Sequence, residues 1–238
     1  LAFAVGAART AVEAALETED FAAAMTALSG TTNTGNVVFN VVAGSGPYLE
    51  QVIIPAHTPG AFTTTINGNG NTLSFASPSS NMWVLTFATG TSKVTVDNLV
   101  VTNTATTTTT VGGIGLLGTA NNNTVSNCTV TLPLTATGTT SAGIAITGSA
   151  TTVTTGGTGG NNTITGNTVT GGYYGLTAYG TAAGVTAGTC INNVFTNNVV
   201  RDVYAYQLYS VQQTNPQFIN NDVSRPTRTN STTVYCMY

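Results

Sequence analysis

The spacing of hydrophobic residues changes once along this chain, near residue 30. Before that point Val12 and Leu16 lie four residues apart, and Phe21, Met25 and Leu28 continue at helical spacing. This periodicity predicts one amphipathic helix broken near residue 18, or two short helices.

Residues with known end preferences set the expected boundaries of the second helix. Thr18 is a typical N-cap, Glu19 and Asp20 would then occupy the positive end of the helix, and Gly30 stands where a helix stop is expected. We therefore predict that residues 1–30 form a helical segment that also caps the remainder of the fold.

Beyond Asn36 the period becomes two. Val37, Phe39 and Val41 occupy alternate positions, and after a Gly-Ser-Gly-Pro turn a second run extends from Leu49 to Ile54. Such runs, separated by Gly, Pro and Asn, continue to the C-terminus and are typical of short strands joined by turns.

Pairs of asparagines recur with one internal spacing of five residues. The sequence contexts are NLVVTN, NNTVSN, NTITGN and NNVFTN, with a degraded copy, FINNDVS, near the C-terminus. The first Asn recurs at intervals of 24, 40 and 30 residues, which indicates a solenoid with insertions in its loops. The paired residues are Asn98 and Asn103, Asn122 and Asn127, Asn162 and Asn167, and Asn192 and Asn197.

A parallel β-helix explains why one residue type returns at each repeat. Its coils stack about 4.8 Å apart, so equivalent turn residues lie above one another and Asn amides can hydrogen-bond as a ladder. Asn also tolerates the left-handed backbone that a sharp bend needs. We predict an all-β fold, a right-handed parallel β-helix (solenoid) over residues 31–238 with a C-terminal tail, preceded by the α-helical segment.

Charge is almost absent from the repeats. The span from Asn98 to Val200, 103 residues, contains no Lys, Arg, Asp, Glu or His, and only 13 of the 238 residues are Asp, Glu, Lys or Arg. Five scattered basic residues could not neutralise a phosphate track, and no apolar run reaches the ~20 residues of a membrane span. We predict neither a nucleic-acid partner nor a membrane span.

The repeats NNTVSNCTVTL and NNTITGNTVTGGYYGL resemble those of right-handed parallel β-helix proteins of the pectate-lyase-like superfamily. The stretch GNVVFNVVAGSGPYLEQVIIPA, preceded by EDFAAAMTAL, resembles the N-terminal cap and first coil of secreted bacterial β-helix surface proteins. The resemblance implies an extracellular or cell-surface location. It also implies that polysaccharide cleavage must be considered, through a Ca²⁺ cluster or paired carboxylates.

Neither catalytic arrangement has residues to form it in the middle coils. Asp202 and Asp222, 20 residues apart and each after an Asn-rich repeat, are the best alternative pair. A surface ion-pair cluster is the simpler interpretation of these two residues, so we predict no catalytic residue, no metal and no cofactor.

Two kinds of contact surface remain. Tyrosines gather late in the chain, including Tyr204, Tyr206 and Tyr209, and Tyr is common where proteins meet sugars or other proteins. The open ends of a solenoid also need covering. The candidate assembly contacts are those three tyrosines and the apolar N-terminal residues Leu1, Phe3, Val5, Val12 and Leu16.

We therefore predict a non-enzymatic extracellular structural or surface protein, a self-associating filament, sheath or adhesin subunit that forms a homo-oligomer or polymer. The alternative is a β-helix protein that binds or cleaves a polysaccharide, with a glycan as its partner.

Overall fold

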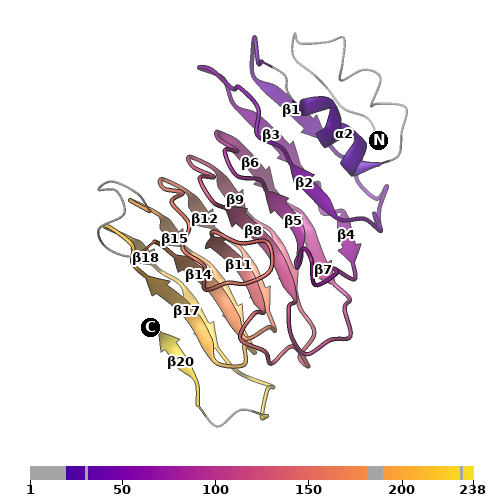
Figure 1. Cartoon of the computed structure of the whole chain (residues 1–238). Coiled ribbons are helices and arrows are strands. Elements are labelled where there is room, and N and C mark those ends of the chain that lie inside the picture. Colours follow the sequence, from indigo (N-terminus) through magenta and orange to yellow (C-terminus); the bar gives the residue numbers. More distant parts are fainter. Residues whose placement is uncertain (1–19, 30–31, 182–189, 231–232) are drawn as a thin grey trace.

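The computed structural model describes residues 20–29, 32–181, 190–230 and 233–238. In it the chain winds as a parallel β-solenoid of about six turns, with three strands in each complete turn (Figure 1). The predicted fold class, an all-β parallel β-helix with an N-terminal helix, is confirmed.

Strands that follow one another in a coil belong to three different sheets, and each pairs in parallel with its equivalents in the neighbouring coils. The first sheet contains β1 (Val37–Asn40), β3 (Thr64–Asn67), β6 (Val94–Asp97), β9 (Thr124–Ser126), β12 (Thr163–Thr165), β15 (Val194–Thr196) and β18 (Gln217–Ile219). The second contains β4 (Thr72–Phe75), β7 (Val100–Asn103), β10 (Thr129–Thr131), β13 (Thr168–Thr170), β16 (Val199–Arg201) and β19 (Asp222–Ser224). The third contains β2 (Val52–Ile54), β5 (Trp83–Phe87), β8 (Gly112–Leu117), β11 (Ala142–Thr147), β14 (Tyr174–Tyr179), β17 (Tyr206–Val211) and β20 (Tyr235–Met237).

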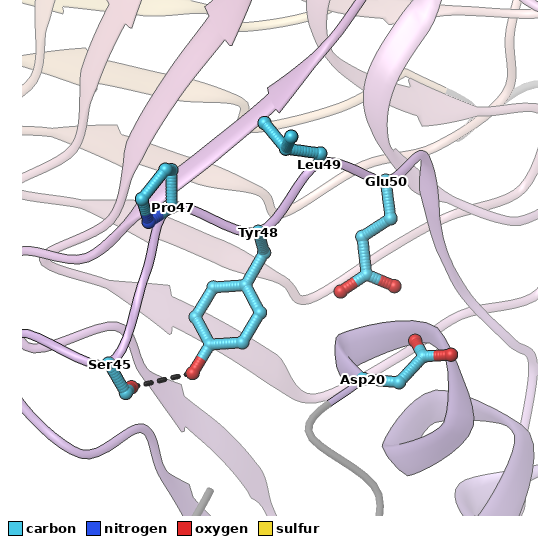
Figure 2. Close-up of a pocket in the computed structure, with 6 residues that line it drawn as sticks. All are labelled: Asp20, Ser45, Pro47, Tyr48, Leu49 and Glu50. Carbon is cyan, nitrogen blue, oxygen red and sulfur yellow. Dashed lines mark hydrogen bonds between the residues drawn. The ribbon is translucent and has the colours of Figure 1, made fainter.

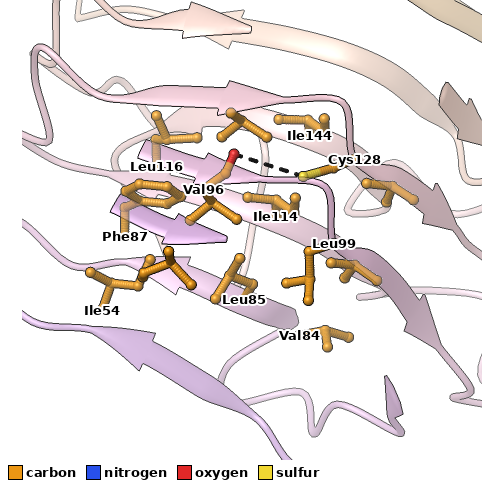
Figure 3. Close-up of a cluster of buried hydrophobic side chains, with 14 of the residues drawn as sticks. Ile54, Val84, Leu85, Phe87, Val96, Leu99, Ile114, Leu116, Cys128 and Ile144 are labelled. Carbon is orange, nitrogen blue, oxygen red and sulfur yellow. Dashed lines mark hydrogen bonds between the residues drawn. The ribbon is translucent and has the colours of Figure 1, made fainter. Parts of the chain in front are cut away.

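Side chains that share a register position form the core. In the third sheet Leu85, Ile114, Ile144, Leu176 and Leu208 succeed one another from coil to coil, all nearly inaccessible to solvent. Equivalent columns of Val, Ile, Leu and Phe come from the other two sheets, so the interior is continuous along the axis (Figure 3). Each coil therefore buries its apolar face only against its neighbours and the opposite sheets, as the repeat pattern predicted.

The corner between the first and second sheets has the same form in four successive coils: a residue with left-handed backbone, then a buried residue. The left-handed residues are Asn127, Gly166, Asn197 and Asn220, and the buried or half-buried partners are Cys128, Asn167, Asn198 and Asn221. A second row starts the first-sheet strands, with left-handed Asn122, Asn161 and Asn192 followed by buried Asn123, Asn162 and Asn193.

Each buried Asn bonds the backbone of the preceding coil. Asn198 Oδ1 accepts from Asn167 N at 3.0 Å, and Asn198 Nδ2 donates to Ile164 O at 2.9 Å. Asn167 does the same to Cys128 N and Val125 O. Strand pairing is interrupted at a corner, so these amides supply the bonds that the sheet no longer makes.

The eight predicted ladder residues therefore hold different positions. Asn162 and Asn167 belong to the buried rows, and Asn103 is buried but bonds Ser77 and local backbone instead. The remaining five are the left-handed turn residues Asn98, Asn122, Asn127, Asn192 and Asn197. Of these, Asn192 does form amide bonds between coils, because its Nδ2 donates to Asn161 Oδ1 at 3.2 Å and its Oδ1 accepts from Asn215 Nδ2 at 2.9 Å. Sequence reasoning missed the buried Asn123, Asn193, Asn198 and Asn221.

Helix α2 (Phe21–Leu28) covers the N-terminal end of the solenoid, with Phe21, Met25 and Leu28 buried. Asp20 is its N-cap, since its carboxylate accepts from Ala22 N and Ala23 N. The prediction that Thr18 caps this helix was wrong, because the helix begins three residues later at Phe21; Thr18 and the helix expected before it lie outside the described residues.

Candidate functional site

Tyrosines gather on the outer face of the third sheet, near the C-terminal end of the solenoid. The cluster comprises Tyr173, Tyr174, Tyr179, Tyr204, Tyr206, Tyr209, Tyr235 and Tyr238, from β14, β17, β20 and the residues just outside these strands. We call these eight residues the tyrosine surface. It lies on the last three coils, at the opposite end from α2 (Figure 1).

Strand register builds the tyrosine surface as columns. Tyr174, Tyr206 and Tyr235 occupy one register position in three successive coils, and their rings stack at 5.2 Å and 4.7 Å between centroids. A second column stacks Tyr209 on Tyr238 at 5.3 Å. Because rings in a column cover one another's faces, a column presents mainly its ring edges and hydroxyls sideways to solvent.

The phenolic hydroxyls of this surface are unused. None of the eight hydrogen-bonds another residue of the described chain, and none is buried without access to solvent. Burial, and then the neighbouring phenols, raise the pKa of Tyr173, Tyr174 and Tyr209, so these hydroxyls stay protonated at physiological pH. The surface thus offers neutral donors and acceptors on an aromatic base.

Earlier coils close the same face with their own residues. Trp83 lies against Gly112 and Gly115, where a Cβ atom would come within 2.5 Å of its ring. Its indole Nε1 donates to Ser149 O at 3.2 Å, and buried Val153 belongs to the same cluster. The outer face of the third sheet is therefore shielded from solvent at β5 and β8. At β14, β17 and β20 it is only partly shielded.

The structure brings together the three predicted contacts Tyr204, Tyr206 and Tyr209. Tyr235 and Tyr238 were missed, because they lie in the predicted C-terminal tail, which carries no repeat motif, whereas β20 continues the third sheet. Leu1, Phe3, Val5, Val12 and Leu16 lie outside the described residues, so their role in assembly stays a prediction.

Asp202 and Asp222 have separate structural partners. Asp202 is buried and accepts hydrogen bonds from Thr227 N, Thr227 Oγ1 and Arg228 N at 2.8–2.9 Å. Burial alone would raise the pKa of Asp202, but these bonds outweigh it and hold the pKa below its ordinary value. Asp222 is exposed and pairs with Arg201 at 3.3 Å. Asp202 thus anchors the tail, and Asp222 belongs to a surface ion pair.

The other pair of carboxyls lies at the N-terminal end, in a pocket of about 390 Å³ lined by Asp20, Ser45, Pro47, Tyr48, Leu49 and Glu50 (Figure 2). Glu50 accepts from Phe21 N at 2.7 Å and from Ala22 N at 2.8 Å, so it joins Asp20 in capping α2. Burial, and then the adjacent Asp20, raise the pKa of Glu50 to about 7. Because both carboxyl groups accept hydrogen bonds from backbone amides of α2, we interpret this pair as a cap of the helix.

Neither a metal site nor a catalytic histidine is indicated among the described residues. No three His, Cys, Asp or Glu side chains come together there as metal ligands would. His57 is buried, its Nε2 lies 3.1 Å from Thr64 Oγ1, and burial lowers its pKa. Within the same residues no helix is both long and apolar enough to cross a membrane.

Comparison with known proteins adds little to this picture. No protein-family model and no curated protein sequence matches the chain. Two solved structures of the pectin methylesterase from Aspergillus niger are similar to it. One, in penultimately deglycosylated form, has 12% identity and a TM-score of 0.40 and covers 99% of this chain and 93% of that one. The other, in deglycosylated form, has 13% identity and a TM-score of 0.35 and covers 93% and 86%. No function follows for this chain from a similarity of that degree.

Proposed function

We propose that this chain is an extracellular carbohydrate-binding protein that holds a polysaccharide against its tyrosine surface and does not cleave it. One observation carries the proposal. The phenolic hydroxyls of eight tyrosines gather on one face of one sheet, and none of them has a hydrogen-bond partner among the described residues.

Carbohydrates combine apolar C–H faces with many hydroxyls, and the tyrosine surface matches both. Phenols both donate and accept hydrogen bonds, and their rings offer apolar area with little conformational freedom to lose. Apolar patches at the surface are in addition typical of binding sites, and in this patch Tyr235 and Tyr238 are 40% and 60% exposed while the other rings are buried or half-buried. Strand pairing fixes the backbone of this patch, so ligand binding would not have to order it.

The described residues of the tyrosine surface are uncharged, and this limits the kind of glycan that the surface can bind. Arg228, 5.1 Å from the centre of the Tyr204 ring, directs its guanidinium to the backbone oxygens of Leu134, Gly172 and Asp202. That cation is committed to holding the tail and is not offered to an anion. The proposed ligand is therefore a neutral glycan.

Binding can be tested by titrating neutral and acidic polysaccharides into the protein by calorimetry. Tyr209→Phe removes one hydroxyl and should weaken binding about 2- to 10-fold, as for loss of one hydrogen bond, while Tyr209→Ala should weaken it further. Tyr48→Phe is the matched control, because that hydroxyl bonds Ser45 at the opposite end and its loss should leave affinity unchanged.

Three results would overturn the proposal: no measurable affinity for any polysaccharide, unchanged affinity in both Tyr209 variants, or shortening of the polysaccharide during incubation. If the polysaccharide is shortened, Asp222→Asn would show whether the alternative acidic pair takes part. Cell fractionation of the native source would test the extracellular location.

A further inference from the structure

Two pairs of tyrosine rings connect strands β17 and β20 of the third sheet. Tyr235 on β20 stacks on Tyr206 of β17, with 4.7 Å between the ring centroids and 8° between the ring planes. Tyr238, directly after β20, stacks on Tyr209 of β17 with 5.3 Å and 15°. Both distances lie at the short end of the range for aromatic contacts, so the ring carbons of each pair are close to van der Waals contact.

Strand pairing holds the four rings in these positions. Tyr206 and Tyr235 occupy one register position of the parallel pair β17–β20. Beside the second pair, Tyr238 N donates to Leu208 O at 3.0 Å. The backbone therefore keeps each tyrosine of β17 next to its counterpart in the following coil, and the same two rings meet in every folded molecule.

The phenols of these pairs are free to lose a hydrogen atom. None of the four hydroxyls hydrogen-bonds another described residue, and Tyr206 and Tyr209 are half-buried, so solvent and an oxidant both reach the surface. A phenol that loses one electron and its proton becomes a phenoxyl radical, with its unpaired spin on the oxygen and on ring carbons beside it. Two such radicals in contact combine through these carbons.

We propose that the two ring pairs are a modification site, at which tyrosines of β17 are cross-linked to tyrosines of the β20 segment as dityrosine, with hydrogen peroxide and a peroxidase as the oxidant. Two phenols each give up one electron and one proton. The new bond joins the ring carbons beside the two hydroxyls, and the hydrogens of these carbons move to the oxygens, which restores both phenols. One hydrogen peroxide takes up the two electrons and two protons and leaves as two water molecules.

Coupling within one molecule is favoured over coupling between molecules. Rings that are held in contact react as if each were present at a concentration far above that of a micromolar protein solution. The product closes a loop of the chain, which limits the freedom of the unfolded state as a disulfide does and so keeps β20 on the sheet. The inference does not depend on glycan binding, because it concerns contacts between the tyrosines themselves.

Peptide mapping after treatment with a haem peroxidase and hydrogen peroxide tests the proposal. Trypsin cuts after Arg201 and Arg228 but not after Arg225, which precedes a proline, so β17 lies in the peptide 202–228 and β20 in the peptide 229–238. The treated monomer, unfolded and digested, should yield these two peptides joined, with a mass two hydrogen atoms below their sum and with the blue fluorescence of dityrosine.

Phenylalanine variants identify the residues that react. Tyr235→Phe combined with Tyr238→Phe keeps both rings and removes both hydroxyls, so the joined peptides should be lost. Tyr48→Phe is the matched control, because the Tyr48 ring contacts Phe21 and no tyrosine among the described residues, and the yield should be unchanged. Every protein in the comparison carries Cys236→Ser, since this exposed thiol would otherwise consume the oxidant.

Three outcomes would overturn the proposal: separate peptides after treatment of the folded protein, joined peptides in the double phenylalanine variant, or coupling found only between molecules. The protein without phenylalanine substitutions decides the first and the third outcome. A double variant that fails to fold therefore leaves the test intact.

Discussion

Two neighbouring asparagines, Asn197 and Asn198, should respond in opposite ways to substitution. Asn198 is fully buried, and its amide serves Asn167 N and Ile164 O across the coil boundary. Asn198→Ala leaves both backbone groups buried without a partner. At about 1–3 kcal/mol for each, the expected loss is about 2–6 kcal/mol, a large part of the 5–15 kcal/mol that typically holds a domain together.

Asn197 supplies the control. It has left-handed backbone, with φ of 56°, and no hydrogen bond of its side chain is part of the ladder. Glycine stands at the equivalent position one coil earlier, as Gly166 with φ of 66°. Because glycine adopts this backbone without strain, Asn197→Gly should change stability by no more than about 0.5 kcal/mol.

Urea denaturation followed by circular dichroism measures both variants. The midpoint should fall clearly for Asn198→Ala and stay in place for Asn197→Gly, with similar slopes. Equal losses in the two variants would refute the assignment of separate roles. So would a loss below about 0.5 kcal/mol in Asn198→Ala, because a buried orphaned amide cannot cost so little.

Three further predictions concern other parts of the molecule. Gly115→Ala should push Trp83 from its place, shift the fluorescence of this single tryptophan and cost about 1–3 kcal/mol, whereas Gly35→Ala, with open space around it, should do neither. Cys128→Asn should be tolerated or stabilising, as judged by the melting temperature, because Cys128 occupies a ladder position; a large loss would contradict the equivalence of the coils. The pKa of Glu50 is raised to about 7 from its ordinary 4.5, so the folded state holds this proton more tightly than the unfolded state. The contribution of Glu50 to the stability of the fold is therefore fully present below about pH 4.5 and is lost as the pH rises through 7. Hydrogen exchange in α2, corrected for its intrinsic rate, should be faster at pH 8 than at pH 5, and Glu50→Gln should remove the difference; equal pH dependence in both proteins would contradict it.

The fold was predictable because the chain repeats itself. Recurring Asn pairs and alternating Val, Ile and Thr specify coils of three short strands, and stacking follows once each apolar face has no other place to be buried. The assignment of individual asparagines was not predictable from spacing alone. Each left-handed turn residue directly precedes a buried ladder residue, so turn residues and ladder residues recur with the same five-residue spacing. Asn is suited to both positions, and spacing alone does not tell them apart.

A local signal for the buried rows was nevertheless present. Asn-Asn dipeptides occur at residues 121–122, 122–123, 161–162, 192–193, 197–198 and 220–221, and in all but the first the second Asn bonds the backbone of the preceding coil. Aligning the Asn-Asn dipeptides instead of single Asn residues would have distinguished the turn residues from the buried ladder residues.

The tyrosine surface was predictable only in part. Tyr204, Tyr206 and Tyr209 lie within the repeats, whereas Tyr235 and Tyr238 join them through a tail with no repeat motif. That tail is fixed by Asp202 and Arg228, contacts that link residues 26 or more positions apart. Pairing of this kind depends on the finished coils, so sequence pattern does not reveal it.

The constant corner between the first and second sheets leaves length variation to the rest of the coil. Successive ladder bonds in this row join residues 39, 31 and 23 positions apart, yet their lengths stay at 2.9–3.0 Å. The added residues leave and re-enter the stack elsewhere, as in the segment between β11 and β12. An ancestral coil could thus lengthen or shorten its loops by insertion and deletion without losing register, and the added residues can take on a role of their own, as Ser149 does in accepting the hydrogen bond of Trp83.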